Sequence, residues 1–266
     1  MKMDDFTVVR IEDAIKESRD TTTFILPHKL NSKPGQFVMA WLPGAGERPF
    51  CISGEKEGSF MISVCGVGPV SKQMQKLKKG DRLGFRGPFG THFTIPKNAT
   101  SLAMVGGGYG SAPLAYLTDE AIAQGKKAYF IEGARNKERL VFLGRMRKAG
   151  AEVLVSTDDG SEGVKGYSTD LLKNILKMHK IDKVFTCGPE IMMKKVARVA
   201  QDAGIPSEVS IERYMKCGIG ICGQCAIDEE GICLCKQGPV LSGKKALSLA
   251  EFGRYRRDSM GRKVEW

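Results

Sequence analysis

The sequence of 266 residues predicts a multidomain protein with three parts: an antiparallel β-barrel, an α/β domain on a parallel sheet, and a small cysteine-rich C-terminal module. Three observations predict this fold class. Short β-like runs separated by turn residues fill the first third of the chain, strands and helices then alternate, and a group of cysteines follows. We expect the three parts to span residues 1–97, 98–209 and 210–266.

The first part contains β-like runs such as FTVVRI, QFVMAWL and SFMISV, and this spacing predicts a closed or nearly closed antiparallel barrel. One stretch, residues 70–77, has a helical pattern and follows the glycine cluster CGVGPVS. Backbone amides at Val70 and Ser71, with the Ser71 hydroxyl, suit a pyrophosphate at a helix N-terminus. An ordinary turn capped by Ser71 explains the same residues equally well. Arg48, in RPFCIS, is a candidate for a charge-assisted contact to the same phosphates.

The second part follows a strand, helix, strand rhythm. SLAMVGGG and KAYFIE predict buried strands, and periodic segments predict helices over residues 111–124, 140–149, 169–178 and 190–203. Such alternation predicts a parallel sheet that binds ligands at the carboxyl ends of its strands. The turn VGGGYGSAP lies at one such end, and its glycines allow close approach of backbone amides to a phosphate. The turn is not a clean G-x-G-x-x-G, so alone it indicates dinucleotide binding only weakly.

The third part contains Cys217, Cys222 and Cys225 at C-x4-C-x2-C spacing, followed by Cys233 and Cys235. This spacing with a later fourth cysteine is the plant-type ferredoxin pattern for a [2Fe–2S] cluster. The intervening glycines let the loop turn tightly and direct amide N–H groups at sulfur. Zinc is the alternative, but zinc sites usually pair two C-x2-C knuckles and only one is present. The residues leave the fourth ligand open, because Cys233 and Cys235 would lie on the same face of a strand.

Composition excludes other classes of function. The formal charge is +11, but the basic residues are scattered and no zinc-finger or RNP pattern occurs, so we expect no nucleic-acid partner. The start MKMDDF carries acidic residues where a signal peptide carries positive charge, and no apolar h-region follows it. No run of about 18 apolar residues occurs. We therefore expect a cytoplasmic protein without a membrane partner. No paired carboxylates or Ser/His/Asp set stands out, so the chemistry is expected from cofactors.

Together the three parts resemble the ferredoxin-reductase superfamily, and most closely the electron transfer subunits of type B dihydroorotate dehydrogenases. The resemblance covers essentially the whole chain and rests on RPFCIS, GPFG, VGGGYGSAPL, CGPEIMMK and ERYMKCGIGICGQC…CKQGPV. It implies a bound FAD, a [2Fe–2S] cluster, and NAD as an exchanged electron acceptor. It also implies a flavin-containing catalytic dihydroorotate dehydrogenase subunit as partner, in a heterotetramer with two copies of each.

The resemblance also assigns residues to these sites. The flavin would be lined by Arg48, Pro49, Phe50, Cys51, Met61, Ile62 and Ser63, with its pyrophosphate at Gly68, Pro69, Val70 and Ser71. The nicotinamide nucleotide would be faced by Gly106, Gly107, Gly108 and Gly110. Cys187, in the CGP turn, would lie beside the nicotinamide and flavin rings as the catalytic residue. The family's fourth cluster cysteine precedes a K-x-G-P element, which selects Cys235 beside Cys217, Cys222 and Cys225.

The function that the resemblance implies is to pass electrons from a dihydroorotate-oxidising subunit through the cluster and FAD to NAD, in pyrimidine biosynthesis. Small subunits of other complexes, such as a bifurcating ferredoxin–NADP oxidoreductase or a sulfhydrogenase, share these motifs and are the alternative. A non-catalytic binding module with structural zinc is a third hypothesis. The residues leave NAD versus NADP open, because Arg135 follows the second strand of the α/β part, where a 2′-phosphate would be met.

Overall fold

The structure is a computed structural model that describes residues 6–265. Residues 1–5, on which the expected absence of a signal peptide partly depends, lie outside the described residues. No helix within residues 6–265 is both long enough and apolar enough to cross a membrane.

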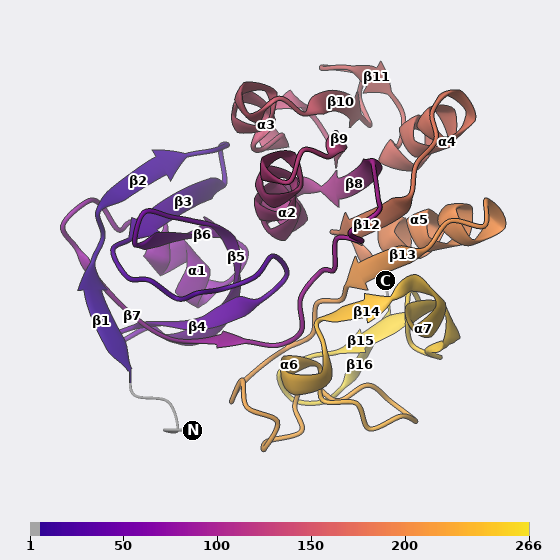
Figure 1. Ribbon diagram of the computed structural model, residues 1–266. Coiled ribbons are helices and arrows are strands. Elements are labelled where there is room, and N and C mark those ends of the chain that lie inside the picture. The colour runs from indigo at the N-terminus through magenta and orange to yellow at the C-terminus, as the bar shows by residue number, and fades with distance from the viewer. Residues whose placement is uncertain (1–5, 266) are drawn as a thin grey trace.

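The N-terminal part is a seven-stranded antiparallel sheet in the order β1-β7-β4-β5-β6-β3-β2 (Figure 1). Its elements are β1 (Thr7–Arg10), β2 (Asp13–Lys16), β3 (Thr21–Leu26), β4 (Phe37–Leu42), β5 (Gly46–Lys56), β6 (Ser59–Cys65), α1 (Pro69–Met74) and β7 (Arg82–Phe89). The sheet curls around an apolar core that includes Phe24, Val38 and Ile62. The helix α1 closes this core through Val70 and Met74. We call this part the flavin sheet, after the ligand that the resemblance implies for it.

The expected closed or nearly closed barrel is instead a curled half-barrel. Within residues 6–265, β1 pairs only with β7 and β2 only with β3. Ile11 and Glu12, which join β1 to β2, donate their amides to opposite edges, to the carbonyls of Asp81 and Ile25. The chain therefore runs on from β1 to β2 without a reversing turn. Antiparallel pairing of two consecutive strands needs such a turn, so β1 and β2 do not pair with each other. The ring of strands therefore stays open at this point.

The second part is a seven-stranded sheet in the order β11-β10-β9-β8-β12-β13-β14, parallel except for β14. Its strands are β8 (Ser101–Gly107), β9 (Lys127–Ala134), β10 (Glu152–Thr157), β11 (Val164–Lys165), β12 (Lys183–Cys187), β13 (Ser207–Ser210) and β14 (Val240–Ser242). The helices are η1 (Gly108–Ser111), α2 (Ala112–Ala123), η2 (Lys137–Arg139), α3 (Leu143–Ala149), α4 (Ser168–Met178) and α5 (Glu190–Asp202). This part confirms the expected alternation of parallel strands and helices.

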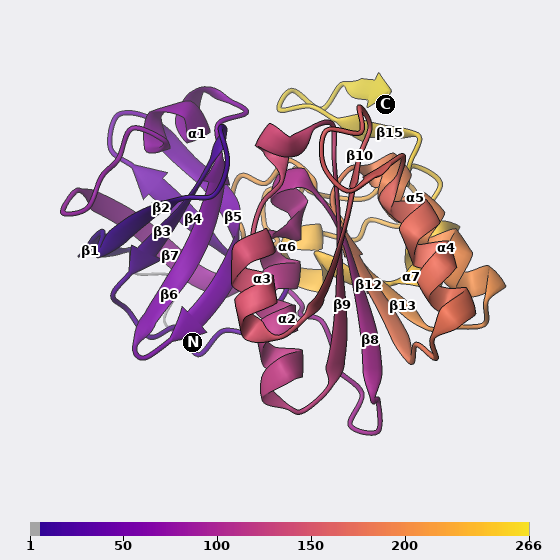
Figure 2. The same ribbon diagram turned by 90° about the horizontal axis from the view of Figure 1, so that it is seen from above.

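The helices cover both faces of this sheet. Figure 2 shows α2 and α3 on one face and α4 and α5 on the other, and each pair closes its own apolar core. The helix expected over residues 140–149 begins three residues later, at Leu143. Phe142 has a φ of 62°, in the left-handed region, so a right-handed helix cannot extend through it.

The C-terminal part packs against both of the other parts (Figure 1). It contains a loop over residues 211–233, then α6 (Leu234–Gln237), β14, α7 (Gly243–Ser248), β15 (Tyr255–Arg257) and β16 (Lys263–Glu265). One apolar core joins Met39 of the flavin sheet, Val209 of the parallel sheet, and Cys225, Leu234 and Phe252 of this part. The loop is thus held against both larger parts by burial of apolar surface.

A buried ion-pair network adds a second connection between the C-terminal part and α5. Arg213 donates from Nη1 to Glu190 Oε2 at 2.6 Å and from Nε to Glu251 Oε1 at 2.6 Å. Glu251 in turn accepts from the amide of Asp228, which lies within the loop over residues 211–233. Because a buried charge is costly without partners, these contacts specify one arrangement of α5 and the loop.

Candidate functional site

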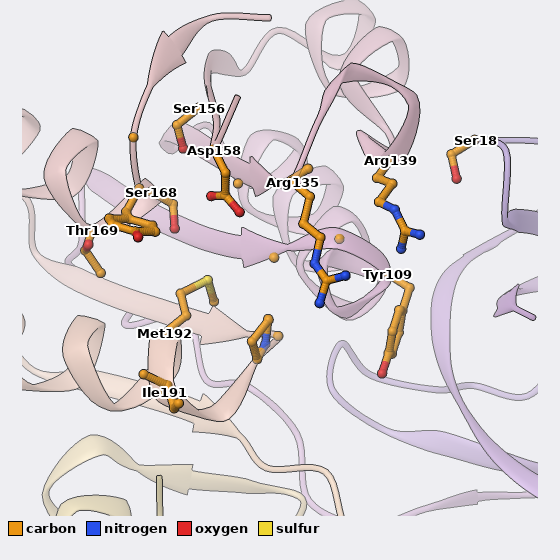
Figure 3. A pocket seen from close by; sticks show the side chains of 18 of the residues that line it. Ser18, Tyr109, Arg135, Arg139, Ser156, Asp158, Ser168, Thr169, Ile191 and Met192 are labelled. Atoms are coloured by element: carbon orange, nitrogen blue, oxygen red, sulfur yellow. The ribbon is translucent and has the colours of Figure 1, made fainter. Parts of the chain in front are cut away.

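A pocket of about 490 Å³ lies at the carboxyl ends of the parallel strands, beside the flavin sheet (Figure 3). The turns after β8, β9, β10 and β12 supply most of its wall, as the carboxyl-end rule for parallel sheets predicts. The opposite wall comes from the flavin sheet. The residues that matter here are Gly107, Gly108, Tyr109, Arg135, Ser156, Asp158 and Gly188 on one side and Asp20 and Cys65 on the other.

Two of the four glycines expected at the nucleotide line this pocket; packing requires glycine at three of the four positions, and a positive φ favours it at the other. A Cβ on Gly107 would lie 2.6 Å from Cδ of Pro189, and Gly108 has a φ of 56°. A Cβ on Gly106 would overlap the Ser111 hydroxyl and lie 2.9 Å from Oε2 of Glu132. Gly106 and Gly110 do not line the pocket but lie under the turn.

Glu132, at the carboxyl end of β9, lies fully buried beneath the glycine-rich turn and accepts a hydrogen bond from the Ser111 hydroxyl. Its Oε1 has no hydrogen-bond partner among the described residues. Burial raises the pKa of Glu132 well above its ordinary value, although Ser111 and the amides of Gly108 and Val141 act in the opposite direction. The sequence reasoning missed this residue, and the signal was a lone acid inside the buried strand KAYFIE.

The residues expected around the flavin lie on two neighbouring strands. Arg48, Pro49, Phe50 and Cys51 are consecutive half-buried residues of β5, and Met61 of β6 is half-buried beside them. Ile62 and Ser63 are both buried, on opposite faces of β6. Ile62 lies in the core, and the Ser63 hydroxyl bonds to the hydroxyls of Thr23 and Ser53 at 2.7 and 2.9 Å.

The residues expected at the pyrophosphate form the start of α1. Gly68 is the N-cap, and Pro69 occupies the first helical position, where its missing N–H costs no hydrogen bond. The Ser71 hydroxyl accepts from the Gly68 amide at 2.9 Å, so it closes the turn. Val70 and Ser71 are buried. Gly46 of β5 lies against Val70, which brings this turn next to the strand that carries Arg48.

A group of ionisable residues joins the flavin sheet to the nucleotide turns. Burial, with the charge of Glu212, raises the pKa of Cys51 to about 12. Burial also raises the pKa of Cys187, and Cys51 and Glu212 act in the same direction. Both thiols therefore stay protonated at neutral pH and are weak nucleophiles. Cys187 pairs in register with Gly106, at the end of the strand next to the glycine-rich turn.

Tyr109 and Glu212 complete this group and were not expected from the sequence. The Tyr109 hydroxyl donates to Glu212 Oε2 at 3.4 Å, and the Glu212 charge raises the pKa of Tyr109. Glu212 keeps a solvent-exposed edge, yet protein surrounds most of its carboxyl group, and this loss of hydration raises its pKa.

We call residues 211–235 the cysteine loop. It directs backbone amides at its sulfur atoms. The amides of Ile219 and Cys222 donate to Cys217 Sγ, each at 3.5 Å, and the amide of Gly220 donates to Cys235 Sγ at 3.1 Å. Gly218, Gly220 and Gly223 all have φ between 68° and 80°, which glycine adopts without strain. Partial burial acts to raise the pKa of Cys217, but the amides of Cys222, Ile219 and Ile221 lower it to about 6. These amides therefore favour the thiolate form of Cys217, the form that binds metal.

The spacing suggested that Cys233 and Cys235 lie on one face of a strand, but the structure places them at the start of a helix. Cys233 is the N-cap of α6, while Cys235 lies within the helix. Cys235 is buried, and its own amide donates to Cys225 Sγ at 3.4 Å. Across residues 6–265, no three His, Cys, Asp or Glu side chains are grouped as around a single metal ion. A [2Fe–2S] cluster divides four thiolates between two iron atoms, so this donor set and its amides fit one.

Comparisons with known proteins identify the family. Residues 104–198 match the family model of the oxidoreductase NAD-binding domain, and residues 212–246 match that of the iron-sulfur cluster binding domain of dihydroorotate dehydrogenase B. A relative from Methanocaldococcus jannaschii, named "Probable dihydroorotate dehydrogenase B (NAD(+)), electron transfer subunit", is 49% identical over 257 residues, which cover 97% of each chain. The chain belongs to this family.

Membership of the dihydroorotate dehydrogenase B electron transfer subunit family confirms the resemblance found in the sequence. The solved structure of an NADH-dependent reduced ferredoxin-NADP oxidoreductase is similar too, with a TM-score of 0.80 and 30% identity over 90% of this chain and 89% of that one. A ferredoxin NADP+ reductase from Neisseria gonorrhoeae, with bound FAD and NADP, has a TM-score of 0.63 at 21% identity, over 75% and 92%. The fold is thus ferredoxin-reductase-like, as expected.

Proposed function

We propose that the protein is the electron transfer subunit of an NAD-linked dihydroorotate dehydrogenase and that it works in pyrimidine biosynthesis. One observation carries this proposal beyond the family name. The cysteine loop, the flavin sheet and the nucleotide sheet share one apolar core, in which Cys225 and Cys235 pack with Met39 and Val209. An arrangement of this kind places an iron–sulfur cluster, FAD and NAD within one rigid frame.

Each cofactor has its own set of residues. We assign the cluster to Cys217, Cys222, Cys225 and Cys235, and the FAD to the half-buried residues of β5 and the start of α1. NAD is assigned to the pocket at the glycine-rich turn. The division into a flavin domain (1–97), a nucleotide domain (98–209) and a cluster domain (210–266) follows these assignments. The strand β14 of the third domain extends the sheet of the second, which keeps the two in contact.

The cofactors supply the chemistry: when bound, FAD exchanges a hydride with NAD and single electrons with the cluster. The protein holds them in place. Amides of residues 219–222 donate toward sulfur, which favours the charged thiolates. Cys187 ends β12, and Gly188 follows it in contact with the glycine-rich turn. The rings of the two cofactors would meet over these two residues. The chain needs no general acid or base for this work.

The partner is a flavin-containing subunit that oxidises dihydroorotate, in a heterotetramer with two copies of each, located in the cytoplasm. The cysteine loop supports a docking role, because Ile221 is 74% exposed and Cys222 is exposed beside it. An apolar side chain held at the surface next to a redox centre is typical of an interaction site. Electrons would enter on this side and leave at the nucleotide pocket on the other.

Anaerobic co-expression with a dihydroorotate-oxidising subunit tests the proposal. The expected result is a coloured complex with flavin and iron–sulfur absorption that reduces NAD only when dihydroorotate is supplied. A colourless, zinc-loaded protein would contradict it. The second candidate, a small subunit of a bifurcating oxidoreductase, rests on the 30% identity to the ferredoxin-NADP oxidoreductase chain. That candidate predicts instead a complex that exchanges electrons with ferredoxin and NADP and ignores dihydroorotate.

A further inference from the structure

Arg86 of β7 connects the flavin sheet to the first cysteine of the loop. Its Nη2 donates to the carbonyl oxygen of Cys217 at 2.6 Å. The same guanidinium binds Glu47 of β5 through two hydrogen bonds, Nε to Oε1 at 2.7 Å and Nη2 to Oε2 at 2.9 Å. The side chains are only 11% and 18% exposed, respectively. A two-pronged pair of this kind has a defined geometry and is weakly screened by salt.

Glu47 also connects to the residue proposed at the flavin. Its carbonyl oxygen accepts from Arg48 Nη1 at 2.7 Å. The Arg48 guanidinium in turn lies 5.3 Å from the ring centroid of Tyr214, three residues before Cys217. Glu47 therefore orients two arginines that both reach the segment leading into the cysteine loop.

The loop lies so close to the flavin sheet that glycine is required at the contact. A Cβ on Gly218 would lie 2.8 Å from Cγ of Met39 and 3.5 Å from the ring of Phe89. The Phe89 ring also lies 5.7 Å from the Arg86 guanidinium carbon. The contact of Arg86 with Cys217 thus belongs to a packed junction, where a shift of either partner displaces the loop.

We propose that Glu47 and Arg86 are positioning residues that fix the iron–sulfur cluster against the flavin sheet and set its reduction potential. The inference rests on the proposed function, because it takes Cys217 as a cluster ligand. Reduction adds one negative charge to the cluster, so the nearby cation of Arg86 favours the reduced form. Glu47 offsets part of that charge. The two residues therefore act on the potential with opposite signs while they share one structural role.

Three variants of the intact subunit separate an electrostatic effect on the reduction potential of the cluster from a purely structural role of Glu47 and Arg86. Arg86→Met removes the cation and is expected to lower the midpoint potential of the cluster. Glu47→Gln keeps the shape but removes the negative charge beside Arg86, and it is expected to raise the potential. Arg86→Lys keeps the charge and is expected to lie nearer the wild type than Arg86→Met does. We expect shifts of at least about threefold in the ratio of reduced to oxidised cluster at a fixed potential, about 28 mV for a one-electron couple.

A redox titration monitored by the electron paramagnetic resonance of the cluster measures these shifts, with FAD and iron content determined in parallel. Arg145→Met is the matched control, because it removes a guanidinium from another part-buried pair, with Asp119, which lies on the helices of the nucleotide domain. It should leave the potential unchanged. Shifts of the same sign in Arg86→Met and Glu47→Gln, or no shift in Glu47→Gln, would overturn the inference. If Arg86→Met loses its cluster, Glu47→Gln and Arg86→Lys still decide the question. A wild-type protein without iron–sulfur signal would refute the proposed function itself.

Discussion

The backbone of Gly110 lies directly against the backbone of Gly188. A Cβ added to Gly110 would stand 2.5 Å from Cα of Gly188, 2.7 Å from its nitrogen and 3.0 Å from the carbonyl carbon of Cys187. Main-chain atoms cannot swing away as the end of a side chain can. The glycine-rich turn and the CGP turn are therefore in direct backbone contact at the edge of the nucleotide pocket.

Gly110→Ala is expected to separate these turns. Overpacking of this kind costs about 1–3 kcal/mol of unfolding free energy, and displacement of the turns should weaken NAD binding at least about tenfold. Thermal unfolding and a titration with NAD measure the two effects. Gly144→Ala is the control: a Cβ there meets nothing within 4 Å, and alanine in the helix α3 should stabilise by about 0.5–1 kcal/mol. Wild-type NAD affinity in Gly110→Ala would show that the contact is unimportant.

Cys235→Ser is expected to abolish the iron–sulfur cluster, whereas Cys233→Ser should retain it. Cys235 is buried and its sulfur accepts the amide of Gly220, while Cys233 is half-buried and caps α6. Iron and acid-labile sulfide, determined after anaerobic purification, measure the outcome. The two variants make the same chemical change two residues apart and so control for each other. Full cluster content in Cys235→Ser would assign the fourth ligand elsewhere.

The raised pKa of Glu132 predicts how stability depends on pH. In the unfolded chain the carboxyl releases its proton near the ordinary value of 4.5, whereas the folded protein retains it to a much higher pH. The folded state therefore binds the extra proton in this window, and the free energy of unfolding falls as the pH rises through it. Glu132→Gln removes this dependence. The thermal midpoint of Glu132→Gln minus that of the wild type should be larger at pH 8 than at pH 5. An equal difference at the two pH values would contradict the raised pKa.

Asp158 is expected to favour NAD over NADP. It lies after β10 and, with Arg135, lines the nucleotide pocket, where Figure 3 shows both side chains. A carboxylate at this position suits a ribose hydroxyl and repels a 2′-phosphate, whereas Arg135 would attract one. Asp158→Asn should therefore improve NADP use relative to NAD by about tenfold or more, about 1.4 kcal/mol, in steady-state kinetics.

The neighbouring residue provides the control for this specificity test. Asp159 binds the amide and the hydroxyl of Ser161 at 2.9 and 2.6 Å, within its own turn, and does not line the pocket. Asp159→Asn should leave the preference unchanged. If both variants change the preference equally, a general change in surface charge explains it, and Asp158 does not read the ribose.

The local parts of the fold were predictable where one element carries its own signal. The helix expected over residues 190–203 is found at Glu190–Asp202, because its apolar residues recur with helical spacing along one face. The barrel was predicted as more closed than it is, since closure depends on how the chain passes from β1 to β2 through Ile11 and Glu12. Strand composition contains no signal for that step.

The candidate site divides in the same way. The cysteine spacing and the glycine-rich turn were visible because their ligands lie close together in the sequence. Glu212, Tyr109 and Arg86 were missed because their partners lie more than 100 residues away along the chain. The contacts of the Ser63 hydroxyl with two hydroxyls from other strands were likewise invisible in the sequence, because Thr23 and Ser53 reach it only across the folded sheet.

By itself, the amino-acid sequence determined which chemical groups are present: thiols spaced for a diiron cluster, and glycines where a nucleotide-binding turn needs them. It also determined the order of the three parts. Only the tertiary structure decided how these groups face one another, from the approach of Gly110 to Gly188 to the reach of Arg86 to Cys217. The reason is physical. Periodicity and spacing act over a few residues, whereas burial and charge pairing act between surfaces that meet only when the chain has folded.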